Sequence, residues 1–153
     1  MPISATRLIL GLALSVAAPL AWAAGECAVD VTADDALRFN SKEIVIPAAC
    51  KQFTVNLAHI GKMPAASMGH NIVIAQTSDL AAVAKDGAAV QPDHVKEGDA
   101  RVIAHTKIIG GGEKTSVTFD TAALRAGGDY SFFCSFPGHW AIMKGKVVTR
   151  QTS

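Results

Sequence analysis

The sequence has little charge of either sign, few aromatic residues and only three cysteines. Its 14 Lys and Arg nearly balance 13 Asp and Glu, which leaves a formal net charge of +1. No basic block or stripe is present, so nucleic acid and anionic membrane surfaces are not expected as partners. Charge steering of a protein partner is expected to be weak for the same reason. Internal repeats and low-complexity tracts are also absent.

Long hydrophobic runs are equally scarce, because only Leu8 to Leu20 forms one, and it is short for a membrane span. Arg7 precedes this run and Ala21-Trp22-Ala23 follows it. A basic start, an apolar centre and an A-x-A site are the pattern of a secretory signal peptide. We therefore predict that residues 1–23 are a signal peptide.

The remaining chain, residues 24–153, is predicted to be one exported domain of about 130 residues, long enough for a real core. A lipoprotein anchor is not indicated, because Glu26 rather than a small residue precedes Cys27. Without Arg7 the 14 basic residues fall to 13, equal to the 13 acidic ones. We expect a periplasmic monomer whose mature chain does not insert into a membrane.

The three cysteines divide into two that can pair and one that stands apart. Cys27 opens the mature chain and Cys50 follows after about two dozen residues, a loop whose closure contributes roughly 3 kcal/mol in the chain-entropy model. An oxidising compartment favours a Cys27–Cys50 disulfide and leaves Cys134 over. An unpaired cysteine in an exported protein is either buried and inert or occupied by a metal.

Short alternating segments predict an all-β protein. Strands are expected near residues 27–32, 43–46, 51–57, 71–75, 101–109, 115–119, 130–133 and 146–150. One segment, residues 78–89, instead has a helical pattern with Ser78 as its N-cap. This order predicts an antiparallel β-sandwich or Greek-key barrel of about 7–8 strands, with one short helix outside the sheets.

The loop from Cys134 to Met143 is the stretch with the most distinctive chemistry. It follows the β-prone run Tyr130–Phe133, turns at Pro137-Gly138 and carries a thiol, an imidazole and a thioether. Two histidines, one thiolate and a weak axial methionine form an electron-transfer copper site. Cys134, His139 and Met143 supply three of these ligands, so the second imidazole must come from elsewhere.

His70 is the favoured second imidazole. It begins an apolar strand, and Gly69 before it allows a close backbone approach, so the Gly69 carbonyl could also face the metal. Without the Cys134 loop, a strand-end histidine held by hydrogen bonds would be the better interpretation. His59 is the next candidate, although a half-buried structural role suits it better. His94 and His105 are interpreted as exposed or loop histidines.

Four other classes of site fit these residues less well. A cysteine hydrolase would use His139 as base, but no third partner is evident. A structural zinc site with two imidazoles and a thiolate has little use for Met143. A multicopper oxidase or nitrite reductase would need further histidines, whereas Phe133 and Ser135 flank Cys134. Copper storage or delivery remains the main alternative and usually employs exposed, exchangeable ligands.

Nearly the whole chain from Cys27 to Arg150 resembles the azurin-type blue-copper proteins of the cupredoxin family. The C-x4-H-x3-M spacing of the loop carries most of this resemblance. The matching segments are 50–57, 68–71, 101–107, 116–120 and 134–145. Two positions depart from the family pattern, since Ile72 replaces a tryptophan found in many members and Trp140 replaces a small residue.

The resemblance implies a role for each residue of the site. It makes His70, Cys134 and His139 the equatorial ligands of one type 1 copper, with Met143 and the Gly69 carbonyl as weak axial ligands. It also implies that Asn71 joins the two ligand loops and that Phe136 shields the sulfur. The Cys27–Cys50 disulfide belongs to the same pattern.

The function expected from these ligands is electron transport, with copper cycling between Cu(II) and Cu(I) and without substrate turnover. Trp140, Met63 and Pro137 are expected to form an apolar docking surface around His139. Suitable partners are redox proteins such as c-type cytochromes or reductases, with which the protein is expected to form transient complexes.

Overall fold

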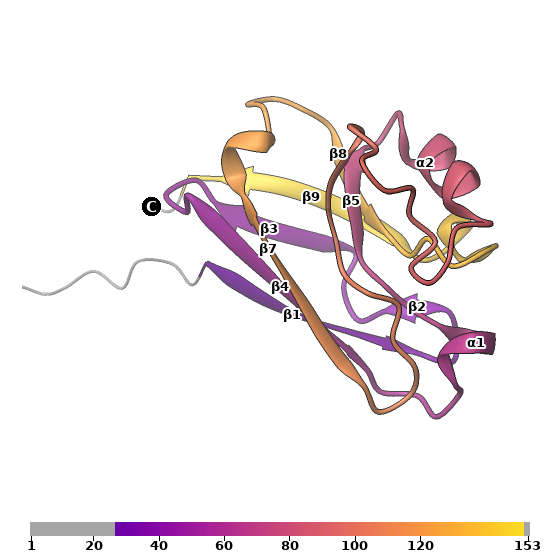
Figure 1. The fold of residues 1–153 in the computed structure, drawn as a ribbon. Helices are drawn as coiled ribbons and strands as arrows, with labels where there is room; N and C mark the ends of the chain where they lie inside the picture. The colour runs from indigo at the N-terminus through magenta and orange to yellow at the C-terminus, as the bar shows by residue number, and fades with distance from the viewer. Residues whose placement is uncertain (1–26, 152–153) are drawn as a thin grey trace, which may run out of the picture.

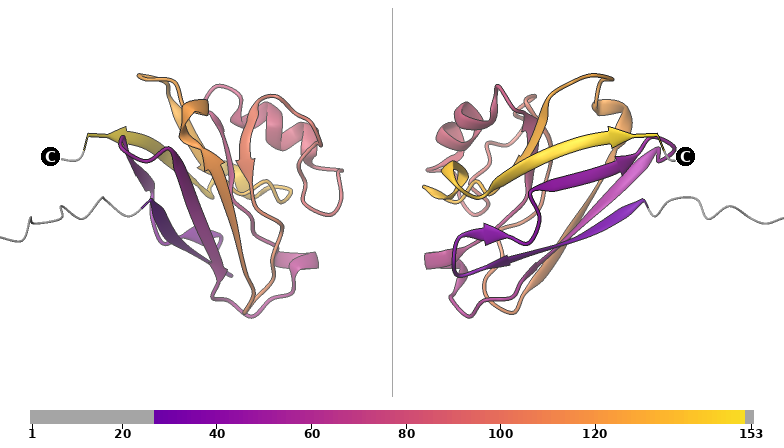
Figure 2. Two further views of the ribbon diagram at one scale, coloured as in Figure 1. Left: turned by 60° about the vertical axis from the view of Figure 1, so that its left-hand side comes forward. Right: turned by 180° about the vertical axis from the view of Figure 1, so that it is seen from behind.

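Strands dominate residues 27–151, the part of the chain that the computed structural model describes, and they pair into two sheets (Figure 1). The four-stranded sheet has the order β2-β1-β4-β7, with β1 Ala28–Asp34, β2 Arg38–Phe39, β4 Gln52–His59 and β7 Lys114–Asp120. The five-stranded sheet has the order β3-β9-β8-β5-β6, with β3 Glu43–Pro47, β5 Val73–Gln76, β6 Val102–His105, β8 Tyr130–Phe133 and β9 Lys144–Arg150. Figure 2 shows the two sheets as layers of a sandwich, as the cupredoxin-like prediction requires.

Strict alternation along β4 builds one wall of the core. Phe53, Val55 and Leu57 are at most 1% exposed, while the residues between them are only half-buried. Successive side chains of a strand point to opposite faces, so this pattern leaves one apolar face for the other sheet. Ile44 and Ile46 of β3 meet it from across the sandwich.

The centre of the five-stranded sheet is buried on both faces. Along β8, Phe132 joins the cluster between the sheets, whereas Phe133 joins a second cluster on the outer face. Helix α2, Leu80–Gly87, covers this outer face with Leu80 and Val83. A strand covered on both sides has no polar face, which explains the continuous aromatic run before Cys134.

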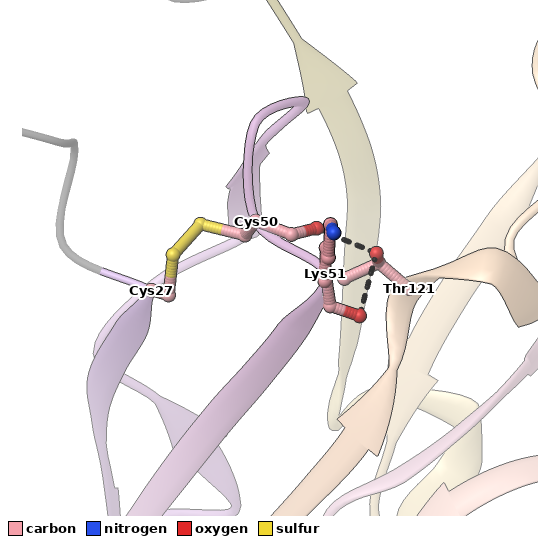
Figure 3. The surroundings of a disulfide bond; sticks show 4 residues. All are labelled: Cys27, Cys50, Lys51 and Thr121. Atoms are coloured by element: carbon pink, nitrogen blue, oxygen red, sulfur yellow. Dashed lines mark hydrogen bonds between the residues drawn. A yellow bond between two sulfur atoms is a disulfide. The ribbon is translucent and has the colours of Figure 1, made fainter.

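The Cys27–Cys50 disulfide predicted from the sequence is confirmed (Figure 3). Its two Cα atoms are 5.6 Å apart, and the bond joins the chain just before β1 to the chain just before β4. Thr121 secures the same corner, because its hydroxyl donates to the carbonyl oxygens of Cys50 at 2.6 Å and Lys51 at 3.0 Å. The bond therefore fastens the starts of two neighbouring strands.

Three details differ from the sequence prediction. The sheets are mixed rather than antiparallel, because β1 pairs with β4 and β3 pairs with β9 in parallel. The expected loop before His70 contains one helical turn, α1 Ala65–Met68. Asp79, not Ser78, occupies the N-cap position of α2, and no side chain caps that helix. Local patterns do not encode pairing direction, since crossing between sheets decides which strands become neighbours.

The predicted signal peptide, residues 1–23, lies outside the described residues. Within residues 27–151, none of the helices has the length and apolar character needed to cross a membrane.

Candidate metal centre

Loops from distant parts of the sequence meet at one end of the sandwich. In Figure 1, α1, α2 and the connection between β8 and β9 lie at the right, and both ends of the described chain lie at the left. His70 stands just before β5, and Cys134 directly follows β8. His139 opens a short 3₁₀ helix, His139–Ala141, after Gly138 has turned the chain with a φ of 86°.

Three donor atoms converge in this end of the molecule. Cys134 Sγ lies 3.8 Å from His70 Nδ1 and 3.6 Å from His139 Nδ1. One ligand atom from each of these residues lies within 4.8 Å of the others, and all three side chains are buried. Among the described residues this is the one group of three or more such side chains close enough to hold a metal ion.

A hydrogen bond outside the group decides which nitrogen of His70 faces the sulfur. His70 Nε2 lies 2.9 Å from the carbonyl oxygen of Asp34, which can only accept. The proton of the neutral ring is therefore on Nε2, and Nδ1 presents its lone pair to the centre. His139 Nε2 has no hydrogen-bond partner among the described residues. Since no buried side-chain nitrogen there lacks a partner, this atom reaches solvent.

Burial keeps all three groups uncharged in the absence of a metal. It raises the pKa of the Cys134 thiol to about 11, although backbone N–H groups of Asn71 and Phe136 oppose the rise. It also lowers the pKa of His70, and lowers that of His139 to about 4 with help from neighbouring His70. A bound cation reverses this preference for the thiol and favours the thiolate.

Met143 and Gly69 complete the surroundings of the sulfur. The Met143 side chain is fully buried in the same cluster as Cys134, and its carbonyl accepts a hydrogen bond from Cys134 N at 3.0 Å. The Gly69 carbonyl oxygen lies 3.8 Å from Cys134 Sγ. A Cβ on Gly69 would lie 2.5 Å from both Ala65 O and Ile108 Cγ2, so only glycine fits here.

Asn71 joins the chain beside His70 to the chain beside Cys134. Its Oδ1 accepts from Ser135 N at 2.9 Å, and its Nδ2 donates to Ser135 Oγ at 2.9 Å and to Asp93 O at 3.0 Å. Asp93 was not predicted from the sequence. Its carbonyl also accepts from Ser135 Oγ at 3.2 Å, and its carboxylate accepts from Ile108 N at 2.8 Å, so this loop residue bonds to three others. No sequence signal marks it, because the contact to Asn71 uses a main-chain carbonyl.

Replacing Asn71 with Ala is expected to lower the free energy of unfolding by about 2 kcal/mol, because it leaves the buried Ser135 N–H without a partner and removes one of the two donors to the Asp93 carbonyl. Urea unfolding of the metal-free protein measures this. Ser135→Ala is the matched control, since it removes only a hydroxyl and should cost about 1 kcal/mol. Equal losses in the two variants would show that Asn71 has no special place in the network.

The other three histidines, His59, His94 and His105, are not part of this group. His59 is 1% exposed, stacks on His70 with ring centroids 4.5 Å apart, and uses both nitrogens, accepting from Gly61 N and donating to Met68 O. It therefore supports the site from behind and has no lone pair for a metal. His105 is exposed at the end of β6. His94 lies in a loop, as expected, but it is buried and packs edge-on against Phe136.

Aromatic and apolar side chains cover the outer side of the centre. The Phe136 ring lies 4.6 Å from that of His139. Met63 and Ile142 are 39% and 55% exposed at this end, and Pro137 and Ala141 are exposed as well. Trp140 is half-buried and packs against the apolar cluster beneath α2. Solvent thus meets His139 through an apolar surface.

The donor set suits a soft or borderline metal ion and opposes a cysteine nucleophile. A nucleophilic cysteine needs an accessible thiolate, whereas Cys134 is fully buried and its pKa is raised. The group contains no carboxylate ligand of the kind that magnesium or calcium prefers. Two imidazoles and a thiolate, with a buried thioether nearby, fit copper.

Comparison with known proteins agrees with this chemistry. Residues 25–150 match the model of copper-binding proteins of the plastocyanin/azurin family. The chain is 57% identical over 123 residues to the azurin of Alcaligenes faecalis, covering 79% of this chain and 96% of that one. It is 55% identical over 139 residues to the azurin of Bordetella pertussis, covering 90% and 93%. The solved structure of an azurin from Methylomonas sp. strain J superposes with a TM-score of 0.79 at 46% identity, covering 82% of this chain and 98% of that one.

Proposed function

This chain belongs to the copper-binding plastocyanin/azurin family and is a blue-copper electron-transfer protein, and from this premise we propose how its residues carry out that function. The convergence of two imidazole nitrogens and one sulfur within 4.8 Å, all buried, is the observation that carries the proposal. His70, Cys134 and His139 would hold one copper ion, with Met143 and the Gly69 carbonyl as weaker ligands. Copper when bound supplies the one-electron Cu(II)/Cu(I) couple.

The protein restricts the movement of these side chains and excludes water from them. The bond from His70 to Asp34 O fixes one ring, and the Asn71 network fixes the chain on either side of Cys134. Electron transfer is fast when the ligands move little between oxidation states, and a packed, hydrogen-bonded surrounding resists such movement. His139 would serve as the exit for the electron, because its Nε2 alone reaches solvent.

We place the docking of redox partners at the apolar surface around His139. Met63, Pro137 and Trp140 border it, and suitable partners are c-type cytochromes or reductases. A small apolar contact favours short encounters over a permanent complex. The protein would act as a monomer in the periplasm, carrying electrons without turning over a substrate.

One visible spectrum tests the proposal. Adding one equivalent of Cu(II) to the metal-free protein should produce an intense blue absorption that disappears on reduction with ascorbate. Metal analysis of the same sample should give one copper per chain. A colourless complex, or one that takes up copper only loosely at the surface, would contradict the assignment of the site.

Met143→Leu is expected to remain blue but to raise the reduction potential by about 60 mV, equal to about a tenfold change in a one-electron equilibrium. Cu(II) prefers a larger number of ligands than Cu(I), so the loss of one weak donor destabilises Cu(II) more and raises the potential. Leucine has a similar volume, so the buried position should tolerate it at less than about 1.5 kcal/mol. Cyclic voltammetry measures the shift.

Met63→Leu is the control for this variant, because Met63 is 39% exposed at the rim rather than enclosed with the sulfur. Its potential should stay unchanged. The same shift in both variants, or complete loss of copper from Met143→Leu, would contradict the role of Met143 as a weak ligand.

A further inference from the structure

Three lysines line a hollow beside Trp140, although the net charge of the whole chain is close to zero. Its volume is about 290 Å³. Trp140, Leu80 and Ala81 form its apolar wall, and Lys42 and Lys146 lie at its edge together with Lys144. Among the residues that line this Trp140 hollow, none is acidic. A nearly neutral protein therefore has a local cationic surface.

The fold, not the sequence, brings the three lysines together. Lys144 and Lys146 lie on β9, while Lys42 comes from the turn before β3, which pairs with β9 in parallel. The Lys42 carbonyl accepts a hydrogen bond from Lys146 N at 2.8 Å, so the two backbones are fixed against each other. This arrangement is built into the sheet.

Two of the three cationic groups are uncompensated. Lys146 Nζ pairs with Asp129 at 2.6 Å, but both side chains are more than half exposed, so the pair is weak. Within residues 27–151, Lys42 and Lys144 form no ion pair. Two free ammonium groups beside an indole favour an occupant that carries both carboxylates and an apolar contact.

The hollow lies directly beside the proposed electron exit. Trp140 follows His139 in the same 3₁₀ helix, so their Cα atoms are about 3.8 Å apart. A partner protein that contacts Trp140 is therefore held at the same end of the molecule as His139.

We propose that the Trp140 hollow is a docking site for an acidic segment on the surface of a redox-partner protein. Carboxylates of the partner meet Lys42, Lys144 and Lys146, and an apolar side chain of the same segment contacts Trp140. This inference rests on the proposed electron-transfer function and adds to it that the docking segment of the partner is negatively charged. It also makes docking selective, since a basic partner is repelled at the same edge.

The kinetic test uses reduced plant-type [2Fe–2S] ferredoxin, an acidic protein, as the electron donor to the copper-loaded protein in a stopped-flow instrument. The double variant Lys42→Glu/Lys144→Glu should react about tenfold more slowly at low ionic strength, and the difference should vanish near 1 M salt. A basic c-type cytochrome as donor should show no slowing. Loss of the difference between donors would overturn the proposal.

Lys51→Glu/Lys114→Glu is the matched control, because it changes the net charge equally with exposed lysines of the four-stranded sheet side. Its rate with ferredoxin should fall less than about twofold. Equal slowing of both double variants would show that net charge alone matters and would overturn the assignment to the hollow. The blue spectrum of each variant verifies that the metal centre is intact.

Binding can be followed without copper by NMR of the metal-free protein titrated with ferredoxin. The indole N–H of Trp140 and the amides of Ala81 and Gly145 should shift or broaden first. Shifts confined to the rim residues Met63 and Ile142 would overturn the inference, as would equal shifts with inorganic phosphate, which indicate a site for small anions. A protein that never turns blue refutes the proposed function, while this titration still tests the hollow.

Discussion

Cys134→Ser protein is expected to lose the intense blue absorption completely and to remain folded. The colour of such a centre comes from charge transfer between thiolate and Cu(II), and serine offers no comparable donor. Copper can still associate with the two imidazoles, so weak colour from other transitions does not conflict with the expectation. The variant should also fail to exchange electrons at a useful rate, since the sulfur is the soft ligand that both oxidation states accept.

The fold should tolerate this change because the pocket already offers a partner for the hydroxyl. Cys134 Sγ lies 3.8 Å from the Gly69 carbonyl and 3.6 Å from His139 Nδ1, and a hydroxyl there can donate to either with small movements. Burying a hydroxyl that has a partner costs about 1 kcal/mol or less. Circular dichroism and urea unfolding check this, and an intensely blue Cys134→Ser protein would refute the ligand assignment.

Removing the disulfide should have the largest effect on stability. Cys27→Ser/Cys50→Ser is expected to lower the free energy of unfolding by about 3 kcal/mol, because the unfolded chain regains the entropy of an open loop. For a domain of this size that corresponds to a fall in melting temperature of roughly 10 °C. Calorimetry of the metal-free protein measures it without a contribution from copper.

The blue spectrum of this variant should be unchanged. The disulfide lies before β4 and His59, which stacks on His70, lies at the end of β4. Eight strand residues at about 3.3 Å each separate the two by about 25 Å. Thr121→Val serves as the control for local damage, since it removes the hydroxyl bonds at the same corner but keeps the cross-link. A similar loss of stability in that variant would assign the effect to the corner rather than to the bond.

The chemistry of the loop after β8 could be predicted from the sequence because its information is local. Cys134, His139 and Met143 lie within a single turn-bearing segment, and their donor types limit the metals that suit them. The strands were predictable for a similar reason, since alternation along Phe53, Val55 and Leu57 follows from the two-residue period of a strand. The cysteine pairing was predictable from the export signal and from the place of Cys134, which stands apart from Cys27 and Cys50 in the ligand loop.

Tertiary structure decided everything that depends on main-chain groups or on which strands become neighbours. The sequence favours His70 over His59, but the reason lies in main-chain groups, because Asp34 O leaves Nδ1 of His70 free, whereas Gly61 N and Met68 O occupy both nitrogens of His59. Any residue type supplies a carbonyl, so no sequence pattern announces these partners. The gathering of Lys42 with Lys144 and Lys146 depends in the same way on the parallel pairing of β3 with β9. Strands β3 and β9 are about a hundred residues apart in the sequence. Their pairing is set by the packing of the whole sandwich rather than by either strand alone.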